Sequence, residues 1–600
     1  MGKRYLPTGN EMISIPKLNE ATAGIEDITF LHMGFKGLVE LRGGEDTALI
    51  EPFVEAEGSP VPLSDIQWER LQFWVPRFSG AAGPLRIEGT ILTPVKERGF
   101  VYRLQLRNPG RDAQTVSFGL RGCWSSAWHC VNEDKEIVGA KYCYSSPWND
   151  SLIFDMRCGV PLFCFAPMSS DNACLSTFEE TEQGMTYRLE HTCTLKAGES
   201  KEVVIYWGLG FEEVAAATSA KEMLRQGYQY EEAVTLAWLR SRTYWIEDKE
   251  LQELYNTNLF FCIFFSTGTT LDTEELVLVT SRSPRYYVSA AYWDRDSLLW
   301  SFPAILDVDR DLARQMLEYV FGPQQRNIGV HSRYIDGTVL EPGFELDELM
   351  APVLALERYI DATGDRVFLT EANVKKGIRS ILGKLNEKRN AGLGLYETFL
   401  QPTDDERVYP YLTYDNALVW KGLRAIAWLY PEEYGSLENE AEEVSNAIWR
   451  YSVKEEGGKR FFAWSVDAEG RYDIYDEPPG SLQLLPSLGF CKDDDEVYRN
   501  TVELIRAPNY AHSFAGYPFA EIGCPHAPHP WLLSVANSLL CGRVEGSLDI
   551  LRRAGMDNGI ICESIDEHTG VCATGEAFAT CAGFVCHGIR VALGMNRNGE

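Results

Sequence analysis

The sequence lacks the segments and motifs that mark several classes of protein. The N-terminal stretch MGKRYLPTGNEMISIP has no apolar region of the signal-peptide kind, and no run of about 18 apolar residues occurs. No G-x-S-x-G, Walker or HExxH motif is present, and no G-x-G-x-x-G follows a predicted strand. We therefore expect a cytoplasmic protein that does not span a membrane and needs neither a cofactor nor a metal.

Basic residues are scarce. Lys and Arg number 56 against 87 Asp and Glu, which gives a net charge of −31. Such a charge argues against nucleic acid or an anionic membrane surface as a partner. Aromatic residues make up 12% of the chain, and although most belong in a core, rings also stack on the apolar faces of sugars. A small neutral carbohydrate is the expected partner, and a homo-oligomer is left open.

The cysteine count of 15 is odd, and the spacing shows no disulfide framework. We therefore expect reduced thiols, as in a cytoplasm. Four cysteines near the C-terminus lack paired C-x-x-C spacing, which favours buried apolar thiols over a zinc site. They are Cys562, Cys572, Cys581 and Cys586.

The length of 600 residues exceeds what one hydrophobic core usually serves, so two domains are expected. Stretches such as FVYRLQLRNPG and HTCTLKAGESKEVVIYWGLG alternate and end in turn signals, which predicts an antiparallel β-sandwich over residues 1–210. Residues 211–245 have a helical pattern and are interpreted as a linker. Residues 246–600 contain about twelve helical segments, among them segments expected over 296–305 and 481–488. As six hairpins these would form an (α/α)6 catalytic barrel with a pocket at one end.

Four clusters in this helical part carry groups suited to sugar chemistry. In YWDRDSLLW, Arg295 lies between Asp294 and Asp296; a guanidinium donates several hydrogen bonds and a carboxylate accepts from two hydroxyls. A helix N-cap with an ion pair is the structural alternative. The loops QPTDDERVYP and GCPHAPHPW offer adjacent aspartates and two histidines, and an exposed turn or a stiff loop would explain them equally well.

A dense acidic cluster stands in LEPGFELDELMAPVLAL, where Glu341, Glu345, Asp347 and Glu348 precede an apolar helical run. Like charges beside an apolar surface raise a carboxyl pKa, which is what a general acid at neutral pH requires. An acidic helix start favoured by the helix dipole is the alternative. In DNGIICESIDEHTG, Glu563 is either a reactive carboxylate or a polar residue where a helix begins.

In chain order, these clusters resemble glycoside hydrolase family 125, the metal-independent exo-α-mannosidases of the (α/α)6 type. YWDRDSLLW resembles the family's Trp-x-Arg-Asp-Ser loop, and FELDELMAPVLALERYIDATGD its acid-bearing helix start. LQPTDDERVYPYLTYDN is similar to its Pro-Ser-Asp-Asp loop, IGCPHAPHPW to its Gly-Ser-Pro-His-Thr loop, and GIICESID to its His-Glu-Ser-Phe loop. Wider relatives with a β-sandwich before such a barrel include glucoamylase-type α-glucosidases.

The resemblance implies an inverting exo-acting α-glycosidase with Asp347 as general acid and Glu563 as general base. Cys562 stands where the family has His, and Gln401 where it has Arg, so glucose is kept beside mannose as the expected terminal hexose. A glycoside phosphorylase or sugar isomerase on the same barrel, and a non-catalytic carbohydrate-binding protein, remain alternatives. The implied substrate-binding residues are Trp293, Arg295, Asp296, Asp404, Asp405 and His526.

Overall fold

The computed structural model describes residues 6–595, which fall into two compact units. Unit 1 comprises the described residues up to Trp245 with Thr267–Leu276 and Arg282–Ala290. Unit 2 comprises Ile246–Ser266, Val277–Ser281 and the described residues from Ala291 onward. Within the described part, no helix combines the length and apolar composition that crossing a membrane requires.

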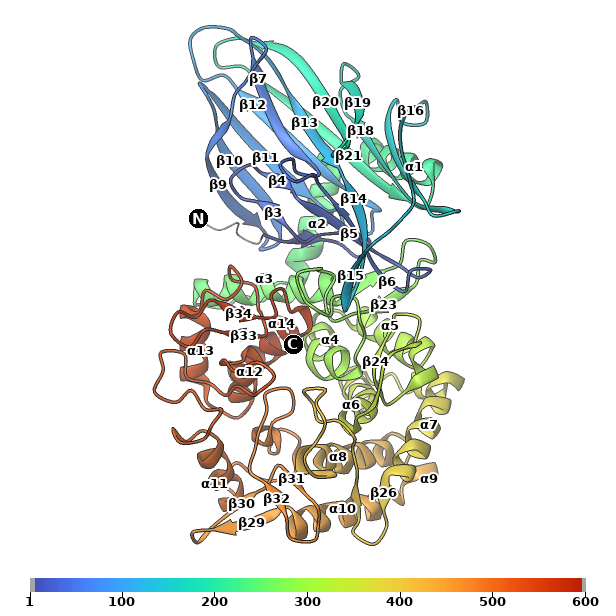
Figure 1. Ribbon diagram of the computed structural model, residues 1–600, viewed down its shortest axis with the longest axis vertical. Helices are drawn as coiled ribbons and strands as arrows, with labels where there is room; N and C mark the ends of the chain where they lie inside the picture. The colour runs from blue at the N-terminus through green and yellow to red at the C-terminus, as the bar shows by residue number, and fades with distance from the viewer. Residues whose placement is uncertain (1–5, 596–600) are drawn as a thin grey trace. The chain divides into compact units, whose positions relative to one another are not determined.

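Three antiparallel sheets make up most of unit 1 (Figure 1). The eight-stranded sheet runs in the order β16 (Ala140–Ser146), β17 (Ser151–Arg157), β18 (Pro161–Ser169), β21 (Ser200–Gly210), β12 (Gly99–Arg107), β11 (Leu85–Leu92), β10 (Val75–Ala82), β9 (Leu63–Leu71). The five-stranded sheet is β19 (Leu175–Thr181), β20 (Gly184–Leu195), β13 (Gln114–Trp124), β7 (Glu51–Ala56), β8 (Ser59–Pro60). The six-stranded sheet is β1 (Thr8–Gly9), β2 (Ser14–Ile15), β5 (Asp27–His32), β6 (Gly37–Arg42), β14 (Ser126–Val131), β15 (Glu133–Glu136), and β3 (Leu18–Asn19) pairs with β4 (Gly24–Ile25).

The alternating pattern that predicted strands is realised in β12. Tyr102, Leu104 and Leu106 are fully buried, whereas Arg103 and Gln105 between them are only partly covered. Successive side chains of a strand point to opposite faces, so the apolar set faces the core. The long strands predicted from such alternation in the first 210 residues are present.

Aromatic side chains join the eight-stranded and five-stranded sheets across one core. The ring of Tyr187 on β20 contacts Phe154 on β17 and Trp207 on β21, with centroid distances of 4.9 Å and 5.8 Å. All three rings belong to a single buried apolar cluster. The two sheets therefore present their apolar faces to each other.

The helical segment 211–245, expected as a linker, forms α1 (Glu213–Gln226) and α2 (Tyr228–Arg242). Helix α1 packs on β18 and β21 of the large sheet. A Cβ on Gly208 would lie 2.1 Å from the carbonyl oxygen of Ala216, and a Cβ on Gly210 would lie 2.3 Å from the backbone nitrogen of Ala216. Glycine is therefore required for this close approach, and α1 is an integral part of unit 1.

Unit 2 is mainly helical, and its helices follow one another around a ring in Figure 1. An inner set is buried almost all round, as expected for helices enclosed by others: α4 (Phe302–Val308), α6 (Leu346–Thr363), α8 (Thr413–Leu429), α12 (Leu532–Leu540), α14 (Ala579–Ala592). A second set is mostly amphipathic and pairs with it: α3 (Lys249–Ser266), α5 (Arg310–Val320), α7 (Ala372–Lys388), α10 (Leu437–Tyr451), α13 (Val544–Arg553), with the short α9 (Pro431–Tyr434). Helix α11 (Glu496–Ile505) packs instead on β30 (Lys459–Phe462) and the turn η4 (Leu482–Leu484).

Short strands and turns connect these helices. They are β22 (Thr267–Thr269), β23 (Leu276–Leu278), β24 (Val330–Arg333), β25 (Val339–Phe344), β26 (Arg389–Asn390), β27 (Leu395–Tyr396), β28 (Tyr411–Leu412), β29 (Val453–Glu456), β30 (Lys459–Phe462), β31 (Ser465–Val466), β32 (Tyr472–Asp473), β33 (Ser564–Ile565), β34 (Cys572–Thr574), the π-helical turn η1 (Arg295–Ser301) and the 3-10 turns η2 (Pro323–Asn327), η3 (Phe368–Thr370), η4 (Leu482–Leu484).

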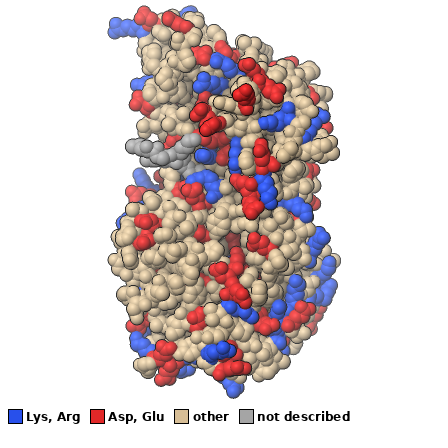
Figure 2. All heavy atoms as spheres, viewed as in Figure 1, with Lys and Arg blue, Asp and Glu red and all other residues tan. Residues whose placement is uncertain are grey.

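Two helix predictions need correction. The helix expected over 481–488 is wrong, because only η4 forms there; Pro486 has no amide hydrogen to donate to the carbonyl of Leu482. The helical segment expected from Asp296 is present, but it begins as the π-helical turn η1, which also contains Arg295, expected in the loop before it. All fifteen cysteines are free thiols. On the face shown in Figure 2, a column of acidic side chains runs down the middle of unit 2.

Candidate active site

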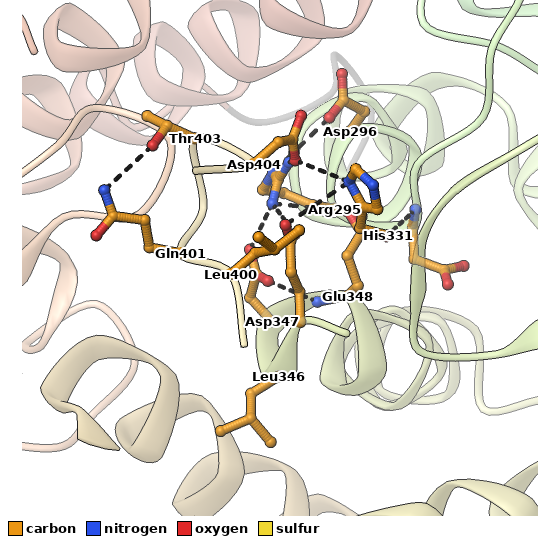
Figure 3. A network of polar contacts seen from close by, with 12 residues as sticks. Arg295, Asp296, His331, Leu346, Asp347, Glu348, Leu400, Gln401, Thr403 and Asp404 are labelled. Atoms are coloured by element: carbon orange, nitrogen blue, oxygen red, sulfur yellow. Dashed lines mark hydrogen bonds and ion pairs between the residues drawn. The ribbon is translucent and has the colours of Figure 1, made fainter. Parts of the chain in front are cut away.

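One buried arginine organises the acidic cluster of unit 2. Arg295 is 2% exposed, and its Nη1 donates to Glu345 Oε2 at 2.7 Å and to Asp347 Oδ2 at 3.0 Å. Its Nη2 donates to Asp404 Oδ1 at 2.7 Å (Figure 3). Burial alone would lower the pKa of Arg295, but the surrounding carboxylates, Asp347 foremost, raise it. The guanidinium therefore stays charged and is shared by carboxylates from separate segments.

The first turn of α6 supplies three of these carboxyl groups. Glu345 is the N-cap residue, and Asp347 and Glu348 follow in the first turn, where the helix dipole favours negative charge. Glu348 accepts from the backbone N–H of Asp294 at 2.5 Å and of Arg295 at 3.1 Å. It thereby fixes the start of η1 against α6. All three carboxyl groups are fully buried.

Burial also changes the ionisation of this cluster. It raises the pKa of Glu345 well above its usual range, and the charge of Asp404 adds to the effect. Burial likewise raises the pKa of Glu348, although the positive charge of Arg295 acts to lower it. Both shifts favour the protonated carboxyl group over the carboxylate, because burial penalises the charged form.

Asp404 reaches the cluster from a tight loop. Its φ of 64° lies in the left-handed region, which aspartate tolerates better than most residues. The buried Glu477 anchors this loop, because it accepts from Gln401 Nε2 at 2.8 Å and from the backbone N–H of Thr403 at 2.9 Å. The carboxylate of Asp404 is thus held in one position by its own backbone and by Glu477.

Arg295 and one histidine keep Asp404 ionised. Burial would raise the pKa of Asp404, but Arg295 and then His331 hold it well below its usual range. Nδ1 of His331 lies 3.5 Å from Asp404 Oδ1. Asp404 therefore remains a hydrogen-bond acceptor at any pH near neutrality.

Glu563 lies immediately before β33, and α14 begins only at Ala579, so the alternative that a helix begins at Glu563 is wrong. Glu563 is 2% exposed, and its Oε2 accepts from Thr574 Oγ1 at 2.6 Å. Its backbone N–H donates to the carbonyl of Gly575 at 3.0 Å. A Cβ on Gly575 would lie 2.4 Å from Glu563 Cβ, so glycine is needed beside this carboxyl group.

Asp296 connects the Arg295 cluster to α14, the helix that follows the Glu563 hairpin in the chain. Its Oδ1 accepts from Thr580 Oγ1 at 2.9 Å, and α14, which carries Thr580, packs on η1. Burial raises the pKa of Asp296 to about 7, although Arg295 opposes the shift. The adjacent Cys581 is buried, and its thiol pKa is raised by burial and by the nearby charges of Glu563 and Asp296.

The structure brings most, but not all, of the predicted site residues together. The ring of Trp293 is 95% buried and meets His331 edge-on, with centroids 6.4 Å apart. Asp405 and His526 form a separate exposed pair, with 3.6 Å between Oδ2 and Nδ1. Among residues 6–595, neither side chain of this pair is hydrogen-bonded or ion-paired to the Arg295 cluster.

Three buried side chains near this centre are absent from the sequence-based site. His331 comes from β24, and Glu477 from the segment after β32. Asp415 lies in the first turn of α8, and neither of its carboxyl oxygens has a hydrogen-bond partner. Burial raises the pKa of Asp415, with Asp347 and Glu477 adding to the shift. His331 has no acidic neighbour in the sequence, Glu477 stands only beside Asp476, and only the YDN after the double aspartate marked Asp415.

Residues 386–589 match the family model of the metal-independent α-mannosidases of glycoside hydrolase family 125. This range contains Asp404, His526 and Glu563, whereas Arg295 and Asp347 precede it. No curated protein matches the chain significantly.

Solved structures extend the similarity over both units. A bacterial glucoamylase in complex with acarbose matches 99% of this chain and 94% of its own, with a TM-score of 0.64 at 13% identity. A putative kojibiose phosphorylase from the human microbiome matches 97% of this chain and 86% of its own, with a TM-score of 0.61 at 11% identity. A metal-independent α-mannosidase from Streptococcus pneumoniae matches 58% of this chain and 95% of its own, with a TM-score of 0.51 at 18% identity. That structure is a non-productive complex with α-1,6-mannobiose. At these identities the likeness concerns the fold. The predicted resemblance to family 125 and to (α/α)6-barrel α-glycosidases is confirmed.

Proposed function

We propose that this chain is an inverting, exo-acting α-glycosidase that releases a terminal mannose or glucose from a small saccharide or glycoside. The observation that carries the proposal is the connected set of buried groups in unit 2. Arg295 donates a hydrogen bond to Asp347, and Asp296, the residue after Arg295, accepts one from Thr580. Thr580 lies on α14, the helix that follows the Glu563 hairpin in the chain. An acid and a base thus stand on separate elements around shared sugar-binding groups.

In this proposal Asp347 protonates the departing glycosidic oxygen, and Glu563 takes a proton from the water that attacks the anomeric carbon. Inverting enzymes hold the two carboxyl groups about 6.5–9.5 Å apart to admit that water. Trp293, Arg295, Asp296 and Asp404 hold the terminal sugar. The exposed Asp405 and His526 contact the substrate beyond it.

The architecture belongs to the same proposal. Pairing of inner and outer helices around a ring supports an (α/α)6 barrel over 246–600. The facing sheets support a β-sandwich over 1–210, and α1 of the segment 211–245 packs on it. The N-terminal and C-terminal parts would then have the order seen in glucoamylase-type enzymes, which the fold match over nearly the whole chain also supports.

A panel of aryl α-glycosides and α-linked disaccharides tests the proposal, with proton NMR used to follow the first sugar released. We expect cleavage of terminal residues only and early release of the β-anomer, since no carboxylate acts as nucleophile. Early release of the α-anomer, or efficient cleavage within a polymer, would contradict it.

A glycoside phosphorylase is the second candidate, favoured by the fold match to a putative kojibiose phosphorylase. In that chemistry inorganic phosphate takes the place of the activated water. Parallel reactions with and without phosphate distinguish the two. Release of free sugar at equal rates supports hydrolysis, whereas a sugar 1-phosphate formed only with phosphate supports the phosphorylase.

A further inference from the structure

We propose that His331, Glu345 and Asp404 form a binding site for a divalent transition-metal cation, with Zn²⁺ as the best match, and that its occupation blocks the candidate active site. The inhibitory part rests on the proposed function, whereas the binding part does not. Zn²⁺ is suited to one imidazole nitrogen and two carboxylate oxygens.

The ligand atoms already stand close to the spacing that a cation needs. Nδ1 of His331 lies 3.5 Å from Asp404 Oδ1 and 3.8 Å from Glu345 Oε1. One ligand atom from each of the three residues lies within 4.8 Å of the others. Tetrahedral zinc with bonds of about 2.0–2.2 Å separates its ligand atoms by roughly 3.3–3.6 Å. Small side-chain adjustments would therefore close the site.

Two of these buried atoms make no hydrogen bond. Nδ1 of His331 and Oε1 of Glu345 have no hydrogen-bond partner, and the two residues are 4% and 0% exposed. Buried polar atoms are normally satisfied, because leaving one unpaired costs about 1–3 kcal/mol. Both atoms face the same point beside Asp404, so a bound cation would satisfy them together.

The histidine is held in a ligating position by its surroundings. It lies in β24, which pairs with β25, so its backbone is fixed. A Cβ on Gly343 would lie 2.9 Å from His331 Cδ2, and the ring of Trp293 meets the imidazole ring edge-on. A ligand that is already oriented loses little freedom on binding, which favours affinity.

Arg295 limits that affinity and links the cation to substrate binding. Its guanidinium donates to Glu345 and Asp404, so a cation must compete with it for both carboxylates. Binding should consequently be reversible and weaker than at a structural zinc site. Because Asp404 is also assigned to substrate, cation and saccharide should exclude each other. Chelation should relieve inhibition without abolishing activity, in keeping with a metal-independent reaction.

The described residues include one other group of potential ligands, which provides a matched control. Glu40, Cys130 and Asp134 lie together in unit 1, but Arg42 bridges the two carboxylates at 2.6 Å each. This second group contains a thiol, whereas the proposed site contains only nitrogen and oxygen. Spectroscopy can therefore tell the two apart.

The binding experiment uses full-length protein treated with EDTA and dialysed, titrated with Zn²⁺ by calorimetry and with Co²⁺ by visible absorption. We expect one Co²⁺ site with d–d bands and no thiolate charge-transfer band. His331→Gln should weaken binding by at least about 10-fold, the scale found even for losing an outer-shell partner. Asp404→Asn should also weaken it, which guards against a folding defect in one variant, and Cys130→Ser should bind like the wild type. No binding at millimolar Zn²⁺, a thiolate band, or unchanged binding by both His331→Gln and Asp404→Asn would overturn the proposal.

The inhibition experiment measures the Zn²⁺ concentration that halves the cleavage of an aryl α-glycoside. We expect competitive inhibition in wild type and Cys130→Ser, reversal by EDTA, and at least about a 10-fold rise in that concentration for His331→Gln. If the protein cleaves no glycoside, the proposed function fails while the calorimetry still decides the cation site. If it cleaves glycosides but binds no Zn²⁺, the cation site alone fails.

Discussion

The carboxyl groups of Asp347 and Glu563 lie in contrasting surroundings. Asp347 is one of several buried carboxyl groups that share the guanidinium of Arg295. Glu563 is instead fixed by the hydroxyl of Thr574 and by the close approach of Gly575. One side of the site is therefore organised by charge and the other by a hydroxyl and tight backbone packing. A substitution on the charged side should disturb several groups at once, whereas one on the other side should act on a single group.

The largest effect is expected for Glu563→Gln. Without a base the attacking water is unassisted whatever group departs, so kcat/KM should fall by about 10²–10⁴-fold on every substrate. The measurement compares a disaccharide with an activated aryl or fluoride glycoside. Wild-type activity on the activated substrate would contradict the assignment of Glu563 as base.

Asp347→Asn should reduce activity in a manner that depends on the leaving group. Poor leaving groups need protonation, so their kcat/KM should fall by about 10²–10⁴-fold, while activated aryl or fluoride substrates retain part of their rate. A plot of log(kcat/KM) against leaving-group pKa measures this. If the dependence appears in Glu563→Gln instead, the two roles are swapped.

Among substitutions in the Arg295 cluster, Arg295→Met should lower the free energy of unfolding the most. Removing the shared cation leaves buried carboxylates uncompensated, so the free energy of unfolding should fall by about 3–5 kcal/mol. Arg314 is the matched control, since it also contacts three carboxylates but its side chain is 31% exposed. Urea titration should give only about 0–1 kcal/mol for Arg314→Met. Equal losses would refute the view that burial makes the Arg295 cluster special.

Asp296 should make stability depend on pH. Burial raises its folded-state pKa to about 7, whereas an unfolded aspartate has a pKa of about 3.9. Between these values the folded protein binds more protons than the unfolded chain, so this contribution is full below pH of about 4 and is lost as pH rises through about 7. Asn cannot ionise, so Asp296→Asn should remove this pH dependence. In urea unfolding at several pH values, the free energy of unfolding of the wild type should fall relative to that of the variant as pH rises from about 4 to about 7; a difference that does not change with pH would contradict it.

Thr574→Val should have the smallest effect. It removes one hydrogen bond to Glu563 and leaves the carboxyl group in place, so kcat/KM should fall by about 10-fold, equivalent to roughly 1.4 kcal/mol. Thr569→Val in the same hairpin is the control, because the hydroxyl of the exposed Thr569 donates a hydrogen bond to the partly exposed Asp566 at 2.8 Å and not to Glu563. A control loss as large as that of Thr574→Val would mean that hairpin stability, not base positioning, is being measured.

Several features of this molecule follow from short-range pattern. Alternation in the first 210 residues predicted the strands because side chains of a strand switch faces at every residue. The acidic run before LMAPVLAL predicted the start of α6, because carboxylates are favoured at a helix N-terminus. Collinear clusters also indicated the family resemblance. Each of these signals resides in residues that are close together in the chain.

Only the tertiary structure decided which of those groups meet. Adjacent residues diverge in the double-aspartate loop, where Asp404 binds Arg295 and Asp405 is exposed beside His526. His331 joins the cluster through the pairing of β24 with β25, and Glu563 is buried by its packing against Gly575. The sequence by itself determined where strands and helices form and which segments carry carboxyl groups. Strands and helices depend on local periodicity and on the residues favoured at helix ends. Packing of elements distant in the chain determined which carboxyl groups share one guanidinium, and with it their burial and protonation.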